Sequence, residues 1–180
     1  MMVEREGDIF STSAAVIGHG CNCRGRMGAG IAVQIRRRYP AAFDAYRTSC
    51  QAGAFRPGLA QLVRTMPHWI LNMATQERYG RPPWRAGSVW ARPEWIESCL
   101  QRVVELANEH NILRWAFPRV GCANGGLYWD AADYEAKLAT YGPALVPPPS
   151  SVFVADLFCR VFGGTRLQVE VWRRPVTTHE

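Results

Sequence analysis

Short apolar runs alternate with longer amphipathic stretches along most of this chain. Runs of strand length cover residues 14–20, 59–64, 68–74, 112–118 and 167–172, with a shorter edge strand expected at 2–6. Helical spacing of apolar residues, or a helix-opening proline, covers 31–38, 40–50, 94–109, a stretch from about 130, and 152–162. This alternation predicts an α/β fold, a three-layer α/β/α sandwich with a mixed, mostly parallel central sheet.

Two glycine-rich segments follow predicted strands. Gly25–Gly30 separates the strand at 14–20 from a helix, and Arg119–Leu127 follows the strand at 112–118. Open parallel sheets bind ligands beyond the carboxyl ends of their strands, so both segments are expected at the binding edge. Converging backbone N–H groups and a helix N-terminus favour an anion. The pair therefore predicts a clamp for a diphosphate, as in a nucleotide diphosphate-sugar.

The first glycine segment matches neither common nucleotide-binding motif. It lacks the Gly-Lys-Ser/Thr ending of a P-loop and the glycine spacing of a dinucleotide fold. Kinases and dehydrogenases are therefore disfavoured. Glycine turns are also ordinary connectors between strands and helices, so the hypothesis rests on the pair of segments rather than on either one.

Length and composition indicate one globular domain over residues 1–180, with a proline-rich excursion around 141–151. The chain has 180 residues, of which 48% are hydrophobic, enough to offset the entropy lost on folding. The net charge of +6 favours phosphates, nucleotides or nucleic acid as partners. The 21 basic residues include a single lysine, Lys137.

Cysteine spacing and the N-terminus indicate the compartment. The six cysteines are scattered, without the spacing of a disulfide framework or a zinc site, and no cofactor is expected. Charged residues at 4–6 stand where a secretory signal needs an apolar core, and no apolar run is long enough to span a bilayer. A cytoplasmic protein without a membrane partner is expected, and the sequence leaves its oligomeric state open.

The motifs in and around the glycine segments resemble the macrodomain family, whose members bind ADP-ribose. The resemblance is carried by Gly7–Phe10, His19–Ala32, Arg38–Pro40, Asn72–Gln76 and Pro118–Trp129. It is strongest to the branch that contains the ADP-ribose-1″-phosphate phosphatase and the DNA-ADP-ribosyl glycohydrolase antitoxins. These share an Asn-Cys-x-Gly-x-x-Gly-x-Gly-Ile-Ala core with this chain. The resemblance implies that ADP-ribose or an ADP-ribose derivative is the ligand.

The resemblance also implies roles for individual residues. Asp8 would accept the adenine amino group, the Ile9 N–H would meet a ring nitrogen, and Asn22 would bond the distal ribose. Backbone donors of the two glycine segments would hold the phosphates, with Cys23 and Cys122 as small lining residues rather than nucleophiles. The remaining implied ligand-binding residues are Gly28, Ala29, Gly30, Ile31, Thr75, Gly121, Cys122, Ala123, Asn124, Gly125, Gly126 and Leu127.

Two positions depart from the catalytic pattern of this branch. Gln76 stands where the glycohydrolases carry a catalytic lysine, and Gly125 stands where some relatives carry an acidic residue. The catalytic candidates that remain are His19 as acid or nucleophile, Asn22 orienting the ribose, and Asp130 orienting water or the histidine. A buried structural histidine and a helix-opening aspartate are the alternatives for His19 and Asp130.

Three functions are compatible with these residues. The leading hypothesis is a hydrolase acting at the distal ribose, similar to ADP-ribose-1″-phosphate phosphatase. The second is a non-catalytic ADP-ribose reader. The third is an antitoxin-like ADP-ribosyl glycohydrolase on modified nucleic acid or protein, against which the missing lysine counts. The arginine-rich segment 78–95, with Trp84 and Trp90, could stack a base, cover the distal ribose or contact the group that carries ADP-ribose. A solvated surface is the alternative, although two exposed tryptophans would be unusual there.

Overall fold

The computed structural model describes residues 1–80, 89–143, 145 and 152–174 of the chain. Most of the expected excursion at 141–151, and Trp84, therefore lie outside the described residues. In chain order the elements are β1 (Met2–Glu6), the 3-10 helix η1 (Ile9–Ser11), β2 (Val16–Cys21), α1 (Gly30–Arg38), α2 (Pro40–Gln51), β3 (Ala60–Val63), β4 (Trp69–Ala74), α4 (Pro93–His110), β5 (Arg114–Pro118), α5 (Ala131–Tyr141), α6 (Val154–Phe162) and β6 (Gln168–Arg173).

Six strands form one sheet in the order β1-β6-β5-β2-β4-β3. All neighbouring strands run parallel except β3, which pairs antiparallel with β4 at one edge. The prediction of a mixed, mostly parallel sheet is thus confirmed. The strand expected at 14–20 begins later, at Val16, because the Thr12 hydroxyl accepts a hydrogen bond from the Ala14 N–H at 3.1 Å and turns the chain there.

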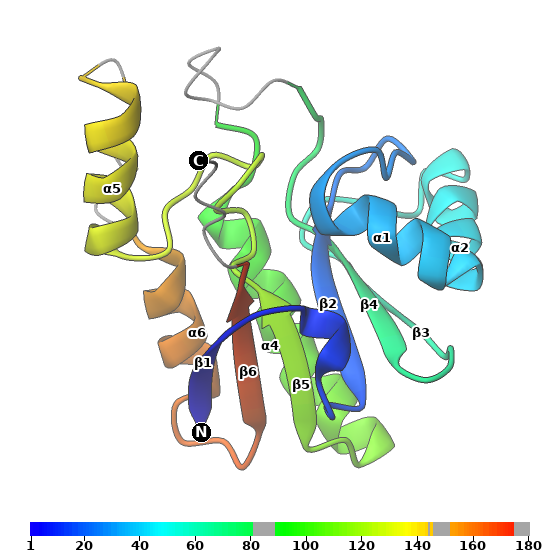
Figure 1. Cartoon of the computed structure of the whole chain (residues 1–180). Helices are drawn as coiled ribbons and strands as arrows, with labels where there is room; N and C mark the ends of the chain where they lie inside the picture. The colour runs from blue at the N-terminus through cyan, green and yellow to red at the C-terminus, as the bar shows by residue number, and fades with distance from the viewer. Residues whose placement is uncertain (81–88, 144, 146–151, 175–180) are drawn as a thin grey trace.

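The two faces of the sheet carry separate apolar cores. Successive side chains of a strand point to opposite faces, and Val16 and Ile17 of β2 accordingly belong to different clusters. Helices η1, α1 and α2 cover one face, and α4 and α6 cover the other (Figure 1). This arrangement is the three-layer sandwich predicted from the sequence.

Aromatic side chains fill the core on the α4 and α6 side. Phe117 of β5 is fully buried, stacks 6.5 Å from Trp115 and meets Phe158 of α6 edge to face at 5.5 Å. A side chain at Gly18 of the neighbouring β2 would come within 2.3 Å of the Phe117 ring. Because Gly18 has no side chain, the Phe117 ring can occupy the space beside it.

Helix α5 differs from the other helices, because none of its residues is buried. It stands at the outside of the fold in Figure 1, and Tyr134 meets Tyr128 of the preceding loop at 4.9 Å. Asp130 is its N-cap residue, so the helix expected from about residue 130 begins at Ala131. Polar contacts rather than an apolar face thus provide much of its attachment to the body of the protein.

The carboxyl ends of the parallel strands meet at one edge of the sheet, the upper edge in Figure 1. Both glycine-rich segments lie there, after β2 and after β5. Within the described residues, no helix combines the length and the apolar character that crossing a bilayer requires.

Removing the Phe117 ring is expected to destabilise the fold strongly. Phe117→Ala should lower the free energy of unfolding by about 3 to 5 kcal/mol, because a buried ring is lost and the aromatic cluster cannot close the space. Urea denaturation measures the change. Leu113→Ala, at a residue that is 47% exposed next to β5, is the control and should change the stability little. Equal losses in the two variants would contradict this description of the core.

Candidate active site

A cavity of about 590 Å³ opens beyond the carboxyl ends of β1, β5 and β6. Its lining residues are Gly7, Asp8, Ile9, Phe10, Ile31, Gln34, Pro118, Trp172, Arg173 and Arg174. The expected adenine-binding residues, Asp8 and Ile9, and the expected phosphate-binding Ile31 are therefore brought together in one concave site. Such a site, largely apolar with a few polar groups, is the usual form of a small-molecule pocket.

Asp8 presents its carboxylate at the mouth of this cavity. One oxygen, Oδ1, accepts a hydrogen bond from the Phe10 N–H at 3.1 Å, and the other lies 3.9 Å from the Arg38 guanidinium. Arg38 also lies over the Phe10 ring, 4.4 Å from its centroid. More than half of each charged side chain is exposed, so this pair orients the carboxylate more than it stabilises the fold.

Trp172 and Gln34 also line the cavity, although they were not predicted from the sequence. Trp172 is near the carboxyl end of β6, and its indole N–H donates to Glu170 at 3.0 Å. Because Trp172 ends a predicted strand, and ligands bind beyond the carboxyl ends of parallel strands, the sequence could have indicated it as a lining residue. Gln34 gave no such signal, because only the packing of α1 against the sheet brings it to the cavity.

The first glycine segment is held in shape by Asn22 and Tyr46. The Asn22 amide donates to the Arg26 carbonyl at 2.7 Å and accepts from the Arg24 N–H at 2.9 Å. The fully buried Tyr46 hydroxyl lies 2.9 Å from the Asn22 carbonyl and accepts from the Arg26 N–H at 3.0 Å. The Asn22 side chain, expected on the distal ribose, is thus engaged within its own loop.

The start of α1 offers backbone donors to an anion. Gly28, Ala29 and Gly30 are exposed, and Gly30 has a φ of +58°, which favours glycine. The N-terminus of α1 has no side-chain cap, and within the described residues the N–H groups of Gly28 and Ala29 make no hydrogen bond. Uncapped N–H groups together with the helix dipole form an anion site.

The second glycine segment folds into a tight loop that two backbone hydrogen bonds close. The Leu127 N–H donates to the Gly121 carbonyl at 3.0 Å and the Gly126 N–H to the Ala123 carbonyl at 3.1 Å. In contrast, the N–H groups of Ala123, Asn124 and Gly125 have no acceptor in the part of the chain that the structure describes.

The two segments face each other across the binding edge. A Cβ atom added to Gly30 would lie 4.0 Å from the Asn124 amide nitrogen. Two sets of backbone donors, unpaired within the described ranges, thus lie on two loops that come close to each other at Gly30 and Asn124, which is compatible with the diphosphate-clamp hypothesis.

Gly125 has no room for the acidic side chain of some relatives. A Cβ there would lie 2.6 Å from the Gly121 carbonyl oxygen and 2.8 Å from the Ala91 side chain. The Gly125 carbonyl in turn accepts from the N–H groups of Trp90 and Ala91 at 2.9 Å. The segment at 90–92 is therefore tied to the second glycine loop.

Thr75 and Gln76 are neighbours in the sequence but differ in burial and in their contacts. Thr75 is buried, and its hydroxyl lies beside Gly20 of β2, where an added Cβ atom would come within 2.7 Å of it. Gln76 is half-buried, forms an isolated antiparallel bridge with Ala91 and donates from its side chain to the Arg78 carbonyl at 2.8 Å.

His19 lies in the core and lines neither of the two cavities described for this structure. Its side chain is fully buried, and its Nε2 lies 2.9 Å from Oδ1 of Asn72 on β4. Because the Asn72 Nδ2 donates to two other acceptors, its Oδ1 accepts and His19 carries its proton on Nε2. Burial lowers the pKa of His19 to about 4, so it is neutral near pH 7. This geometry does not support an acid or nucleophile role, and favours the structural alternative.

Asp130, the remaining catalytic candidate, is engaged as a helix cap, and the cysteines of the two glycine segments are protonated, as expected for lining residues that are not nucleophiles. Asp130 caps α5, with its Oδ1 accepting from the Asp133 N–H at 2.8 Å. Burial raises the pKa of Cys23 to about 11 and raises that of Cys122 well above its usual value, so neither is a thiolate near pH 7. Among the described residues, no cluster of three or more His, Cys, Asp or Glu side chains is arranged to hold a metal ion.

A second cavity of about 380 Å³ lies beyond Gln76. Its lining residues are Glu77, Arg78, Val89, Trp90, Arg92 and Trp95. Part of the arginine-rich segment singled out from the sequence therefore borders a concave surface that combines indole rings with guanidinium groups.

The Macro domain family model matches residues 19–135, and the chain belongs to this family. The matched range includes both glycine segments, Gln76 and the first five residues of α5. The fold and the paired loops described above are thus those of a macrodomain.

Similar proteins place the chain more closely within the family. It is 34% identical over 180 residues to a DNA ADP-ribosyl glycohydrolase of Mycobacterium tuberculosis, covering 98% of this chain and 48% of that protein. The chain thus spans about half the length of this relative. An ADP-ribose 1″-phosphate phosphatase of Aspergillus clavatus is 47% identical over 51 residues, 28% of this chain and 26% of that protein. The solved macrodomain of Mycobacterium tuberculosis DarG superposes with a TM-score of 0.69 at 26% identity, covering 96% and 97% of the two chains.

Buried His19 is expected to make the fold sensitive to acid. Its pKa is about 4 in the folded protein and 6.5 in the unfolded chain, so only the unfolded chain takes up this proton between those values. Stability from neutral His19 is therefore complete above pH 6.5 and is lost as the pH falls toward 4, by about 3 kcal/mol.

Urea denaturation of the wild type and of His19→Gln, from pH 7 to pH 4, measures this contribution. Glutamine can donate to Asn72 but does not titrate in this range. The wild type should lose about 3 kcal/mol more than the variant over this interval. If the free energy of unfolding changed with pH by the same amount in the two proteins, His19 would not titrate as a buried neutral group.

Proposed function

We propose that this macrodomain binds ADP-ribose in the groove between its two glycine segments. Adenosine occupies the cavity beside Asp8 and Ile9, and the diphosphate lies between the segments at 28–31 and 121–127. The single observation that carries the proposal is the pair of backbone donor sets on two neighbouring loops, which have no acceptor among the described residues. A diphosphate supplies acceptors to both sets at once.

The proposal orients the ligand along the sheet edge. With adenosine held near β6, the distal ribose points toward Gln76 and the second cavity. Arg78 and Arg92 there provide positive charge, and Trp90 and Trp95 provide flat apolar surface. We propose that this cavity receives the carrier of ADP-ribose, a modified nucleic acid or protein.

Hydrolysis at the distal ribose is the leading proposal for activity. It is supported by the similarity to a relative named as a DNA ADP-ribosyl glycohydrolase along nearly the whole of this chain, and by the shorter match to a phosphatase. Two reactions are candidates: loss of phosphate from ADP-ribose-1″-phosphate, and release of ADP-ribose from a modified carrier.

A non-catalytic ADP-ribose reader is the second candidate function. Specific observations favour it: Gln76 cannot replace a lysine as a cation, and His19 is buried and uncharged. A reader needs the adenosine cavity and the paired loops but no acid, base or nucleophile beside the distal ribose.

Replacing Asp8 is expected to weaken ADP-ribose binding. Asp8→Ala removes the acceptor for the adenine amino group, and the affinity measured by calorimetry should fall about tenfold. Asp44→Ala, at an exposed aspartate on α2, removes the same charge elsewhere and should bind as the wild type does. Equal affinities in the two variants would contradict the placement of adenine.

Substrate assays separate the enzyme from the reader. The wild type is incubated with ADP-ribose-1″-phosphate, with an ADP-ribosylated oligonucleotide and with an ADP-ribosylated protein, and released phosphate and ADP-ribose are measured. Release from one substrate class identifies the reaction. Tight binding of ADP-ribose without release from any of them would support the reader and contradict the hydrolase.

Restoring lysine at position 76 is expected to increase glycohydrolase activity. Gln76→Lys should raise ADP-ribose release from the modified oligonucleotide by about tenfold or more, because a cation and potential nucleophile then stands beside the distal ribose. Gln51→Lys, at the exposed end of α2, adds the same charge away from the groove and is the control. An unchanged rate in Gln76→Lys would show that this position is not at the reacting bond.

A further inference from the structure

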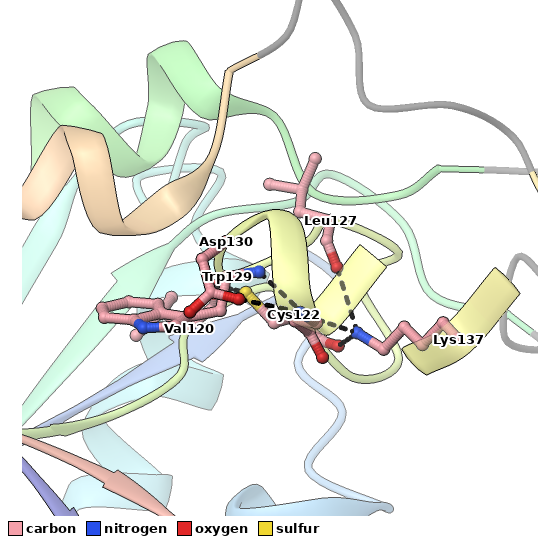
Figure 2. Close-up of polar contacts among 7 residues, drawn as sticks. Val120, Cys122, Leu127, Trp129, Asp130 and Lys137 are labelled. Carbon is pink, nitrogen blue, oxygen red and sulfur yellow. Dashed lines mark hydrogen bonds and ion pairs between the residues drawn. The ribbon is translucent and has the colours of Figure 1, made fainter. Parts of the chain in front are cut away.

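Lys137, the single lysine of the chain, reaches from α5 to the second glycine loop (Figure 2). Its ammonium donates to the Cys122 carbonyl at 2.6 Å and lies 3.5 Å from the Leu127 carbonyl. These two carbonyls flank residues 123–126 of the loop. One cation thus holds both sides of the segment that the proposed function places on a phosphate.

Asp133 completes the attachment of α5 to the second glycine loop. It lies one helical turn before Lys137, and its Oδ2 is 2.9 Å from the ammonium; both side chains are 16% exposed. The same oxygen accepts from the Trp129 N–H at 2.9 Å, while the Asp133 N–H donates to Asp130. The ion pair is largely screened from water, so its geometry is better defined than that of an exposed pair.

The contact with Cys122 fixes the direction of a neighbouring N–H group. In a trans peptide the C=O and the following N–H point in opposite directions. Because Lys137 holds the Cys122 carbonyl toward α5, the Ala123 N–H points away from α5. A cation on the carbonyl also polarises the peptide unit, which makes that N–H a stronger donor. Ala123 is one of the residues whose N–H has no acceptor among the described residues.

We infer that Lys137 is a positioning residue for phosphate binding: with Asp133, it holds the second glycine loop so that the N–H groups of Ala123 to Gly125 face the diphosphate. This inference rests on the proposed function. Lys137 does not touch the ligand in this role and does not replace the lysine absent from position 76. It acts from behind the loop, through the peptide units that it holds.

Calorimetry with two ligands tests the inference, because adenosine fills the same cavity as ADP-ribose but carries no phosphate. In Lys137→Met the affinity for ADP-ribose should fall about tenfold or more, while the affinity for adenosine stays within about twofold of the wild type. Lys137→Arg, which can donate to the same carbonyls, should recover most of the ADP-ribose affinity. Glu135→Gln, which changes an exposed charge on the same helix, is the control and should leave both affinities unchanged.

A second variant keeps the test decisive if Lys137→Met does not fold. Asp133→Asn keeps an acceptor for the Trp129 N–H but removes the ion pair, and it should show the same selective loss for ADP-ribose, to a smaller extent. Equal losses for both ligands, or no loss for either, would overturn the inference. Failure of the wild type to bind ADP-ribose would instead contradict the proposed function, so the two failures are distinguishable.

Discussion

Backbone N–H groups without acceptors among the described residues, gathered at the carboxyl edge of a parallel sheet, are the constraint on which the site depends. An N–H group that has no acceptor within the protein is satisfied by water or by a ligand, so it is available to an anion. Here they occur at 28–29 and at 123–125, on two loops that approach each other at Gly30 and Asn124. The parallel strands bring both loops to one edge of the sheet.

Each loop is held from behind by polar side chains. Tyr46 and Asn22 fix the first loop, and Lys137 with Asp133 fixes the second. Donors that are already oriented lose less conformational entropy when the ligand binds. In the proposed complex, these side chains hold the loops from the protein side, and the loop backbone binds the ligand. This explains why several polar residues near the motifs are engaged internally.

Much of the fold and part of the site could be predicted from the sequence. Hydrophobic runs located the strands, and the glycine segments after β2 and β5 identified the binding edge, because both signals are local. The roles of His19 and Asn22 could not be predicted in the same way, since their environment depends on residues distant in sequence: Asn72 on β4 for His19, and Tyr46 on α2 for Asn22. Lys137 carried no motif at all, and only the placement of α5 against the second loop gives it a role.

Amide chemical shifts, recorded by NMR during titration with ADP-ribose, test the paired-loop clamp most directly. Large downfield shifts of the N–H protons at Gly28, Ala29, Ala123, Asn124 and Gly125, saturating together with the resonances that line the adenosine cavity, are the predicted result. Shifts confined to the adenosine cavity, with the amides of both loops unchanged at saturating ligand, would contradict the clamp.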